Sequence, residues 1–258
     1  MQYTFTDLVD IMARLRGEGG CPWDAEQTHQ SLRKNLIEEA YESLEAIDSG
    51  DGAIMADELG DLLLQIVFHA QIGKENGTFT IDDVTDAICQ KMIRRHPHVF
   101  SDGTAKTSAD VLEKWDEIKK QEKKQSKASE TLSSVSAYLP ALMRAEKVQT
   151  KAAKVGFDWP DALSALEKVR EETEEVSRAL RDKHAIEEEI GDLLFSVVNV
   201  ARLAALDAEE TMQHATEKFI RRFSKMEEIA VKTNKKLDEL HIDELELLWK
   251  TSKIELEN

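Results

Sequence analysis

An internal duplication constrains the fold of this chain more than any other feature of its sequence. Residues 38–42 read EEAYE and are followed by ELGDLL at 58–63, and residues 171–175 read EETEE and are followed by EIGDLL at 189–194. Matched residues lie 133 positions apart in the first motif and 131 in the second. Because this period is about half of the 258 residues, we expect two homologous domains rather than a solenoid of short repeats.

The two copies share further landmarks. KMIRR at 91–95 matches KFIRR at 218–222, and the four tryptophans fall two to a copy. Between 119 and 136 the chain is rich in Lys, Gln and Ser and poor in large apolar residues, which is typical of a linker or a frayed helix end. The sequence therefore predicts an N-terminal domain over 1–120, a charged linker over 121–136 and a C-terminal domain over 137–258.

Turn-forming residues are scarce, since the chain has 11 glycines and 4 prolines. Their combined share is about half of the usual value of roughly 12%, which favours long helices over sheets. Apolar periodicity predicts a loop over 17–22, N-caps at Thr80 and Ser108 and a helix stop at Pro97. The predicted helices cover residues 4–16, 31–47, 53–74, 80–95 and a segment from 108 in the first copy, and 160–181, 184–205, 207–231 and 243–250 in the second. No strand pattern of useful length is present, so we predict an all-α fold.

The net charge of −17 disfavours nucleic acid as a partner, because phosphate backbones are bound by Lys and Arg. An anionic substrate would need another source of positive charge, and a divalent metal supplies it. Cys21 and Cys89 are too few for a disulfide framework, and the longest apolar run, near 62–68, is too short to span a membrane. We therefore expect a cytoplasmic protein with no membrane partner.

Two acidic pairs in each copy have the spacing of a metal site. Glu172 and Glu175 share one helix face, and Glu189 and Asp192 share a face of the next helix. An antiparallel hairpin would bring the pairs together, where the carboxylates repel unless a cation lies among them. Oxygen ligands favour Mg²⁺ or Mn²⁺ over zinc. The first copy repeats the set as Glu39, Glu42, Glu58 and Asp61.

A single acidic motif of this kind is more often a solvated helix face. Here the motif occurs twice, and an apolar run follows both Asp61 and Asp192. This recurrence favours a metal site over a solvated helix face. A di-iron carboxylate bundle would need Glu-x-x-His on two helices, and the chain has this spacing only at Glu26 and His29. That alternative is therefore disfavoured.

At these residues the chain resembles the MazG family of all-α nucleoside triphosphate pyrophosphohydrolases, in its tandem-domain form. Both copies carry EExxE followed by ExxD, and three flanking segments also match: GCPWD at 20–24, RRHPHVF at 94–100 and KVGFDW at 154–159. The resemblance implies two tandem helical domains, each with a four-helix-bundle type core completed by dimerisation. It also implies Mg²⁺-dependent cleavage of an NTP or dNTP to the nucleoside monophosphate and pyrophosphate, with Mn²⁺ as a substitute ion.

The resemblance assigns roles to individual residues. The metal ligands would be Glu172, Glu175, Glu189 and Asp192. Apart from the resemblance, we expect water to be the nucleophile, activated by the metal or by a carboxylate such as Glu171, which makes Glu171, Glu172 and Glu175 the candidate catalytic residues. Substrate contacts would come from Lys168, Lys218, Arg222 and Trp249, with Lys91 and Arg95 as first-copy counterparts. Independently, Lys218 and Arg222 are four apart and can face one triphosphate. Surface pairing with Glu217 or Glu227, and core packing for Trp249, remain the structural alternatives.

The two copies differ in one positively charged residue beside the acidic motif. Asn35 stands in the first copy where Lys168 stands in the second, so the first copy has less positive charge for a triphosphate. We therefore expect the C-terminal domain to be the main active site. A helical dimerising scaffold or a nucleotide sensor without turnover is the alternative from another functional class.

Overall fold

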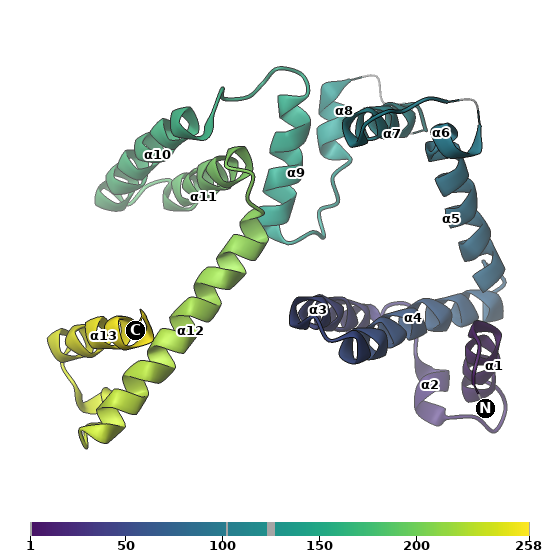
Figure 1. Cartoon of the computed structure of the whole chain (residues 1–258), viewed down its shortest axis with the longest axis horizontal. Helices are drawn as coiled ribbons and strands as arrows, with labels where there is room; N and C mark the ends of the chain where they lie inside the picture. Colours follow the sequence, from purple (N-terminus) through teal and green to yellow (C-terminus); the bar gives the residue numbers. More distant parts are fainter. Residues whose placement is uncertain (1, 102, 123–126, 258) are drawn as a thin grey trace. The chain divides into compact units, whose positions relative to one another are not determined.

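The computed structural model describes residues 2–101, 103–122 and 127–257, and it is helical with no strand in these ranges (Figure 1). This confirms the predicted all-α class. The chain divides into two compact units, Met1–Ile118 and Lys119–Asn258. The predicted linker lies partly outside the described residues, at 123–126, and its limits at 121 and 136 remain a prediction. No described helix is long and apolar enough to cross a bilayer.

The helices of the first unit follow one another with short connections. They are α1 (Phe5–Arg16), α2 (Pro22–Glu26), α3 (Arg33–Ser49), α4 (Gly52–Glu75), α5 (Ile81–Arg95), α6 (Pro97–Phe100) and α7 (Ser108–Glu122), the last of which crosses the unit boundary. The second unit holds α8 (Ala128–Ser133), α9 (Ala141–Ala153), α10 (Ala162–Asp182), α11 (Ile186–Leu203), α12 (Ala208–Lys232), a 3₁₀ turn (Leu237–Glu239) and α13 (Ile242–Glu257).

Each unit is built on one antiparallel helical hairpin, α3–α4 in the first and α10–α11 in the second. Gly50 ends α3 in the left-handed region at φ 68°, and the Asp51 carboxylate caps α4 by accepting from the Ala53 and Ile54 N–H groups. In the second unit Lys183 and Ala185 adopt φ of 54° and 55° between the two helices. Both turns are tight, so the acidic motifs on successive helices face each other.

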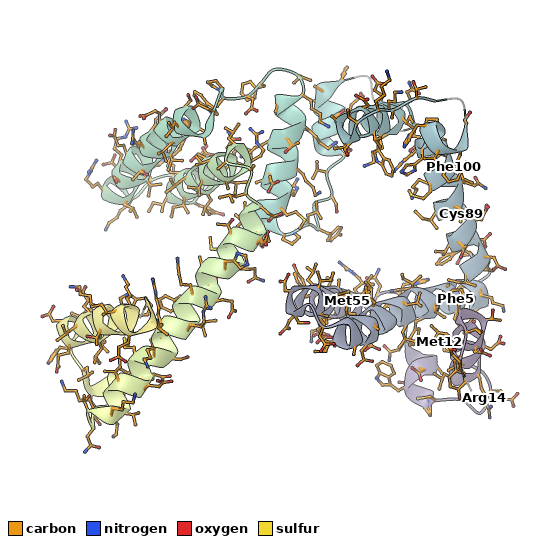
Figure 2. All side chains as sticks on the ribbon, in the orientation of Figure 1. Phe5, Met12, Arg14, Met55, Cys89 and Phe100 are labelled. Atoms are coloured by element: carbon orange, nitrogen blue, oxygen red, sulfur yellow. The ribbon has the colours of Figure 1, made fainter. Side chains whose placement is uncertain are left out.

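A third helix packs on the end of each hairpin that lies away from the tight turn. Met12 of α1 (Figure 2) is buried with Leu32, Val67, Phe68 and Ile72, which forms the core of the first unit. In the second unit α9 packs on α11, and Gln149 Nε2 donates to the Phe195 carbonyl at 2.7 Å. These contacts fix the hairpins while their acidic middle sections stay accessible.

Several predicted elements need correction. Helix α9 was not predicted, because it precedes the duplicated motifs from which the second copy was recognised, and α13 continues to Glu257 rather than ending at Lys250. The expected loop runs into α2, which begins at Pro22. The predicted helix stop at Pro97 is confirmed, since α5 ends at Arg95, and Pro97 then begins the one-turn helix α6. Thr107 rather than Ser108 caps α7, since its Oγ1 accepts from the Asp110 N–H at 3.2 Å.

Candidate active site

The C-terminal carboxylates meet where α10 and α11 pack together. Glu172 of α10 and Glu189 and Asp192 of α11 each offer an oxygen atom, and these atoms all lie within 4.8 Å of one another. Glu172 is only 4% exposed, and it lies between the buried Ala165 and Ala179, seven residues to either side on α10. Two alanines on this stripe let the helices approach closely, and the approach buries the carboxylate between them.

Lys168 forms an ion pair with the buried Glu172 carboxylate. Its Nζ lies 2.6 Å from Glu172 Oε1 and 3.0 Å from Glu171 Oε1, one helical turn along α10. The hydrogen bond to Glu172, followed by that to Glu171, raises the pKa of Lys168 and keeps it protonated. Glu172 Oε2 is buried and has no hydrogen-bond partner among the residues that the structure describes. A buried carboxylate oxygen without a donor, beside two further carboxylates, fits a divalent cation.

The carboxylates of the second unit repel one another. Burial, then the charges of Glu175 and Glu172, raise the pKa of Glu189 above its usual value. Two predicted ligands, Glu175 and its first-copy counterpart Glu42, are not among the grouped ligand atoms. The Glu175 carboxylate instead forms an ion pair with Arg178 at 3.0 Å. An open pocket of about 290 Å³ adjoins the group and is lined by Glu175, Arg178, His184 and Glu189. Arg178 is a site residue that the sequence reasoning missed, although its place three residues after Glu175 marks it as a partner.

The first unit repeats the group with different partners. Glu39, Glu58 and Asp61 bring three oxygen atoms within 4.8 Å of one another. Burial, then the charges of Asp61 and Glu42, raise the pKa of Glu39. Gln65, 6% exposed, donates from Nε2 to Glu39 Oε1 at 3.5 Å, and its own Oε1 is buried without a partner. Gln65 was also missed, although it lies one turn after Asp61.

The predicted basic and aromatic residues of the second copy lie on α12 and α13. Lys218 and Arg222 line a pocket of about 230 Å³ together with Arg221 and Leu256. Trp249 packs against Phe219 of α12, with ring centroids 5.0 Å apart, which agrees with the packing alternative for this residue. Among the described residues, Lys168 is paired with the buried carboxylate Glu172, whereas Lys218 and Arg222 line a different pocket.

The corresponding residues of the first copy show a related arrangement. The Arg95 guanidinium lies over the Trp115 ring, 5.4 Å from its centroid, and His96 meets the same ring edge-on at 4.8 Å. Lys91 lies one turn earlier on α5. In both copies, therefore, a tryptophan from a later helix packs on the helix that carries the basic pair, on Arg95 in the first copy and on Phe219 in the second.

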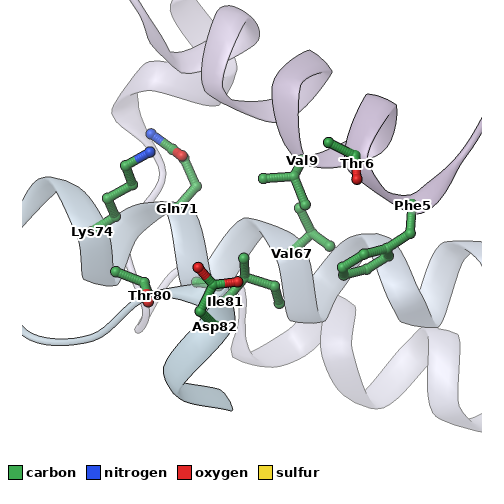
Figure 3. Close-up of a pocket in the computed structure, with 10 residues that line it drawn as sticks. Phe5, Thr6, Val9, Val67, Gln71, Lys74, Thr80, Ile81 and Asp82 are labelled. Atoms are coloured by element: carbon green, nitrogen blue, oxygen red, sulfur yellow. The ribbon is translucent and has the colours of Figure 1, made fainter. Parts of the chain in front are cut away.

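A hollow of about 320 Å³ lies elsewhere in the first unit, between α1, α4 and the start of α5 (Figure 3). Val9 and Val67 are among its apolar walls, and Gln71 and Lys74 are among its polar residues. None of the predicted site residues lines it, so we assign it no part in the chemistry.

The MazG nucleotide pyrophosphohydrolase domain model matches this chain twice, over residues 27–100 and 161–239. The chain belongs to the MazG nucleotide pyrophosphohydrolase family. Both matched segments contain one complete acidic group, so the tandem-domain resemblance drawn from the motifs is confirmed.

Two named relatives match this chain over almost their whole length. The chain is 47% identical to a Thermotoga maritima protein named "Nucleoside triphosphate pyrophosphohydrolase/pyrophosphatase MazG", over 96% of this chain and 95% of the relative. It is 43% identical to the Escherichia coli K12 "Nucleoside triphosphate pyrophosphohydrolase", over 95% of each. The Bacillus subtilis protein YabN is 48% identical over 98% of this chain, which spans 52% of that protein.

The two later tryptophans, Trp115 and Trp249, lie outside both segments of this chain that match the MazG domain model.

Proposed function

We propose that this MazG protein hydrolyses nucleoside triphosphates, or their deoxy forms, to the nucleoside monophosphate and pyrophosphate with Mg²⁺, and that the C-terminal carboxylates form its main active site. The observation that carries the proposal is the buried Glu172 carboxylate, which has one oxygen on Lys168, one oxygen unpartnered, and Glu189 and Asp192 beside it. The printed names of the Thermotoga and Escherichia relatives support the same activity.

The donor set fits magnesium. Glu172, Glu189 and Asp192 would hold the ion, with Glu175 reaching it when its ion pair with Arg178 opens. The bound ion would neutralise phosphate charge and lower the pKa of a water molecule, and Mn²⁺ has the same preference for oxygen ligands. The alternative, a zinc site, is disfavoured because no Cys or His joins the group of described residues.

The chain's own residues bind and orient the substrate in this proposal. Lys168, already protonated and one-third exposed, turns from Glu171 to a phosphate oxygen. This frees the exposed Glu171 carboxylate to accept a proton from the attacking water. The water oxygen bonds to one of the two bridged phosphorus atoms, and the oxygen between the α and β phosphates leaves that phosphorus with the electron pair of the broken bond. Lys218 and Arg222 keep their predicted role of adding positive charge to the triphosphate, and Trp249 that of contacting the nucleotide, although in this chain they lie apart from the grouped carboxylates.

Dimerisation forms part of the proposal because the hairpins leave apolar faces exposed. Leu180, Leu194 and Phe195 of α10 and α11 are 55%, 48% and 45% exposed, and Ile37 and Leu44 of α3 are 55% and 54% exposed. A second hairpin packed on each face would bury these side chains in a four-helix bundle. We therefore infer a homodimer, and we place it in the reducing cytoplasm, in line with two free cysteines.

The test is pyrophosphate release from a panel of NTPs and dNTPs with and without Mg²⁺. Glu172→Gln should lower kcat by at least about a hundredfold, whereas Glu39→Gln should retain most of the activity. Glu174→Gln, an exposed acid two residues from Glu172, is the matched control and should behave like the parent. Nucleotide binding without turnover in the parent protein would refute the proposal in favour of a sensor. Loss of activity in Glu39→Gln alone would move the main site to the first domain.

A further inference from the structure

Two histidines of the first unit share a hydrogen bond that the proposed chemistry does not use. His29 Nδ1 and His69 Nδ1 lie 2.8 Å apart, and the two rings are nearly parallel, with their centroids 5.1 Å apart. Both residues are partly buried, and the Phe79 ring stacks with that of His29 at 5.9 Å between centroids. His69 lies about two helical turns after Asp61 on α4, so the pair is separate from the acidic group.

Two imidazole rings joined in this way can hold at most one extra proton. A neutral imidazole has one N–H, so one Nδ1 donates, and the ring that accepts has its own proton on Nε2. A first added proton goes to Nε2 of the donor ring, and the hydrogen bond survives. A second must go to the Nδ1 atom that accepts, which leaves two N–H groups and two positive charges facing each other. The second proton therefore breaks the contact.

The surroundings of the pair disfavour this second proton. Burial, and after it the charge of His29, lowers the pKa of His69 below the usual histidine value. The charged side chains at the ends of the elements packed around the pair are Arg14 and Arg16 of α1, Asp24 and Glu26 of α2, Arg33 and Lys34 of α3, Lys74 and Glu75 of α4, and Asp82 and Asp83 of α5. Of these, Arg16 and Glu75 pair with each other at 2.7 Å, and Asp83 accepts from the Thr80 N–H at 2.8 Å in the cap of α5.

The pair fixes the segment that leads into α3. Residues 27–32 connect α2 to α3, and α3 has no side-chain N-cap, so its start depends on how this segment is held. At one end Arg16 donates to the Gln27 carbonyl at 3.1 Å, and at the other Leu32, 1% exposed, is buried in the core. Between these two anchors, the hydrogen bond of His29 joins the segment to α4. Loss of this bond therefore loosens the start of the helix that bears the first acidic motif.

We propose that the His29–His69 pair makes the attachment of residues 27–32 to α4 sensitive to acid: the segment stays attached while the pair holds one extra proton or none, and it detaches when the pair takes up a second. Ala162 and Val200 stand at the matching positions of the second copy, so only the first copy carries the pair. The proposal goes beyond the proposed hydrolysis and does not depend on it.

The direction of the pH dependence follows from the lowered pKa of His69. The folded state binds this proton less tightly than the detached segment does. The contribution of the pair to stability is therefore fully present above the usual histidine pKa of 6.5 and is lost as pH falls through the lowered pKa.

The test is hydrogen exchange of the Leu32 amide, measured by NMR on the full-length, nucleotide-free protein. This N–H donates to the Thr28 carbonyl at 3.2 Å within the segment, so its protection factor reports detachment. Between pH 7.5 and 5.5 we expect the protection factor to fall several-fold. The limit is about tenfold, which applies to one histidine of ordinary pKa that takes up no proton while the segment is attached.

Variants separate the pair from other titrating groups. His69→Gln removes the titrating ring and keeps an amide that can bond to His29, so its protection factor should change less than twofold over the same range. His29→Gln removes the neighbouring charge but leaves His69 buried, so part of the pH dependence should remain. His214→Gln replaces an exposed histidine of α12 and is the matched control, which should behave like the parent.

The titration of the two rings in the parent protein, followed by ¹H–¹⁵N NMR of the imidazole nitrogens, needs no variant and decides the matter if His69→Gln fails to fold. Above pH 7 one ring of the pair should carry its proton on Nδ1 and the other on Nε2, and His69 should titrate below pH 6.5. Two results would overturn the proposal: independent titration of both rings at the usual histidine pKa, or an equal fall of the Leu32 protection factor in the parent and in His69→Gln.

Discussion

Replacing Lys168 by methionine tests whether this side chain stabilises the buried carboxylate of the second unit. The Glu172 side chain is 5% exposed and Lys168 is 35% exposed, so the pair is buried at the carboxylate and partly solvated at the ammonium. Methionine keeps much of the apolar stem and removes the charge. Glu172 would then have neither oxygen paired, because Oε2 already has no partner.

The magnitude follows from the burial of the two partners. Breaking a fully buried ion pair costs about 3–5 kcal/mol, and an exposed pair contributes less than about 1 kcal/mol. With one buried and one partly solvated partner, we expect Lys168→Met to lower the free energy of unfolding by about 1–3 kcal/mol in metal-free buffer. Saturating Mg²⁺ should recover most of this loss, since a bound cation supplies the missing counter-charge.

The assay is urea unfolding followed by circular dichroism, with and without Mg²⁺. Arg170→Met is the matched control, because Arg170 also forms an ion pair within α10, with Glu167 three residues earlier. Unlike the Lys168 pair, this pair is solvated on both sides, since the Arg170 side chain is 65% exposed and the Glu167 side chain is 67% exposed. The control should change stability by less than about 0.5 kcal/mol. Equal unfolding midpoints for Lys168→Met and Arg170→Met, in the absence of metal, would refute the reasoning.

Three further predictions rest on other contacts. The pKa of Glu189 is raised above its usual 4.5, so the folded state binds this proton more tightly than the unfolded chain does. The contribution of Glu189 to stability is therefore fully present below pH 4.5 and is lost as pH rises through the raised pKa. Glu189→Gln should therefore melt at a higher temperature than the metal-free parent at pH 7, and at the same temperature at pH 4; a lower melting temperature at pH 7 would contradict this. Leu194→Asp should shift the protein from dimer to monomer in light scattering, because it places a charge on an apolar face that is 48% exposed at this residue; an unchanged mass would show that this face is not the interface. Asp51→Ala removes the cap of α4, which accepts from the Ala53 N–H at 2.8 Å, and should cost about 1 kcal/mol in urea unfolding, whereas Asp51→Asn should cost less.

The hairpins and their acidic faces could be predicted from spacing alone. Residues three or four apart share a helix face, and two such pairs on successive helices meet when the turn between them is tight. This reasoning placed Glu172 with Glu189 and Asp192, and Glu39 with Glu58 and Asp61, as the structure has them. It also placed Glu175 and Glu42 in these groups, and the structure leaves both outside them, with Glu175 paired to Arg178. Spacing along one helix shows which acids share a face, but it does not show how far each carboxylate reaches toward the neighbouring helix.

The order of residues by itself determined the class of fold, the duplication and the two sets of carboxylates, because helical periodicity and motif recurrence are local properties of the chain. Only the tertiary structure decided which carboxylate is buried, that Lys168 holds one of its oxygens and leaves the other unpartnered, and that Gln65 faces the equivalent group in the first unit. The burial of a carboxylate depends on how closely the two helices approach. This interhelical distance is set by packing across the hairpin, at positions such as Ala165 and Ala179. It cannot be derived from the spacing of residues along one helix.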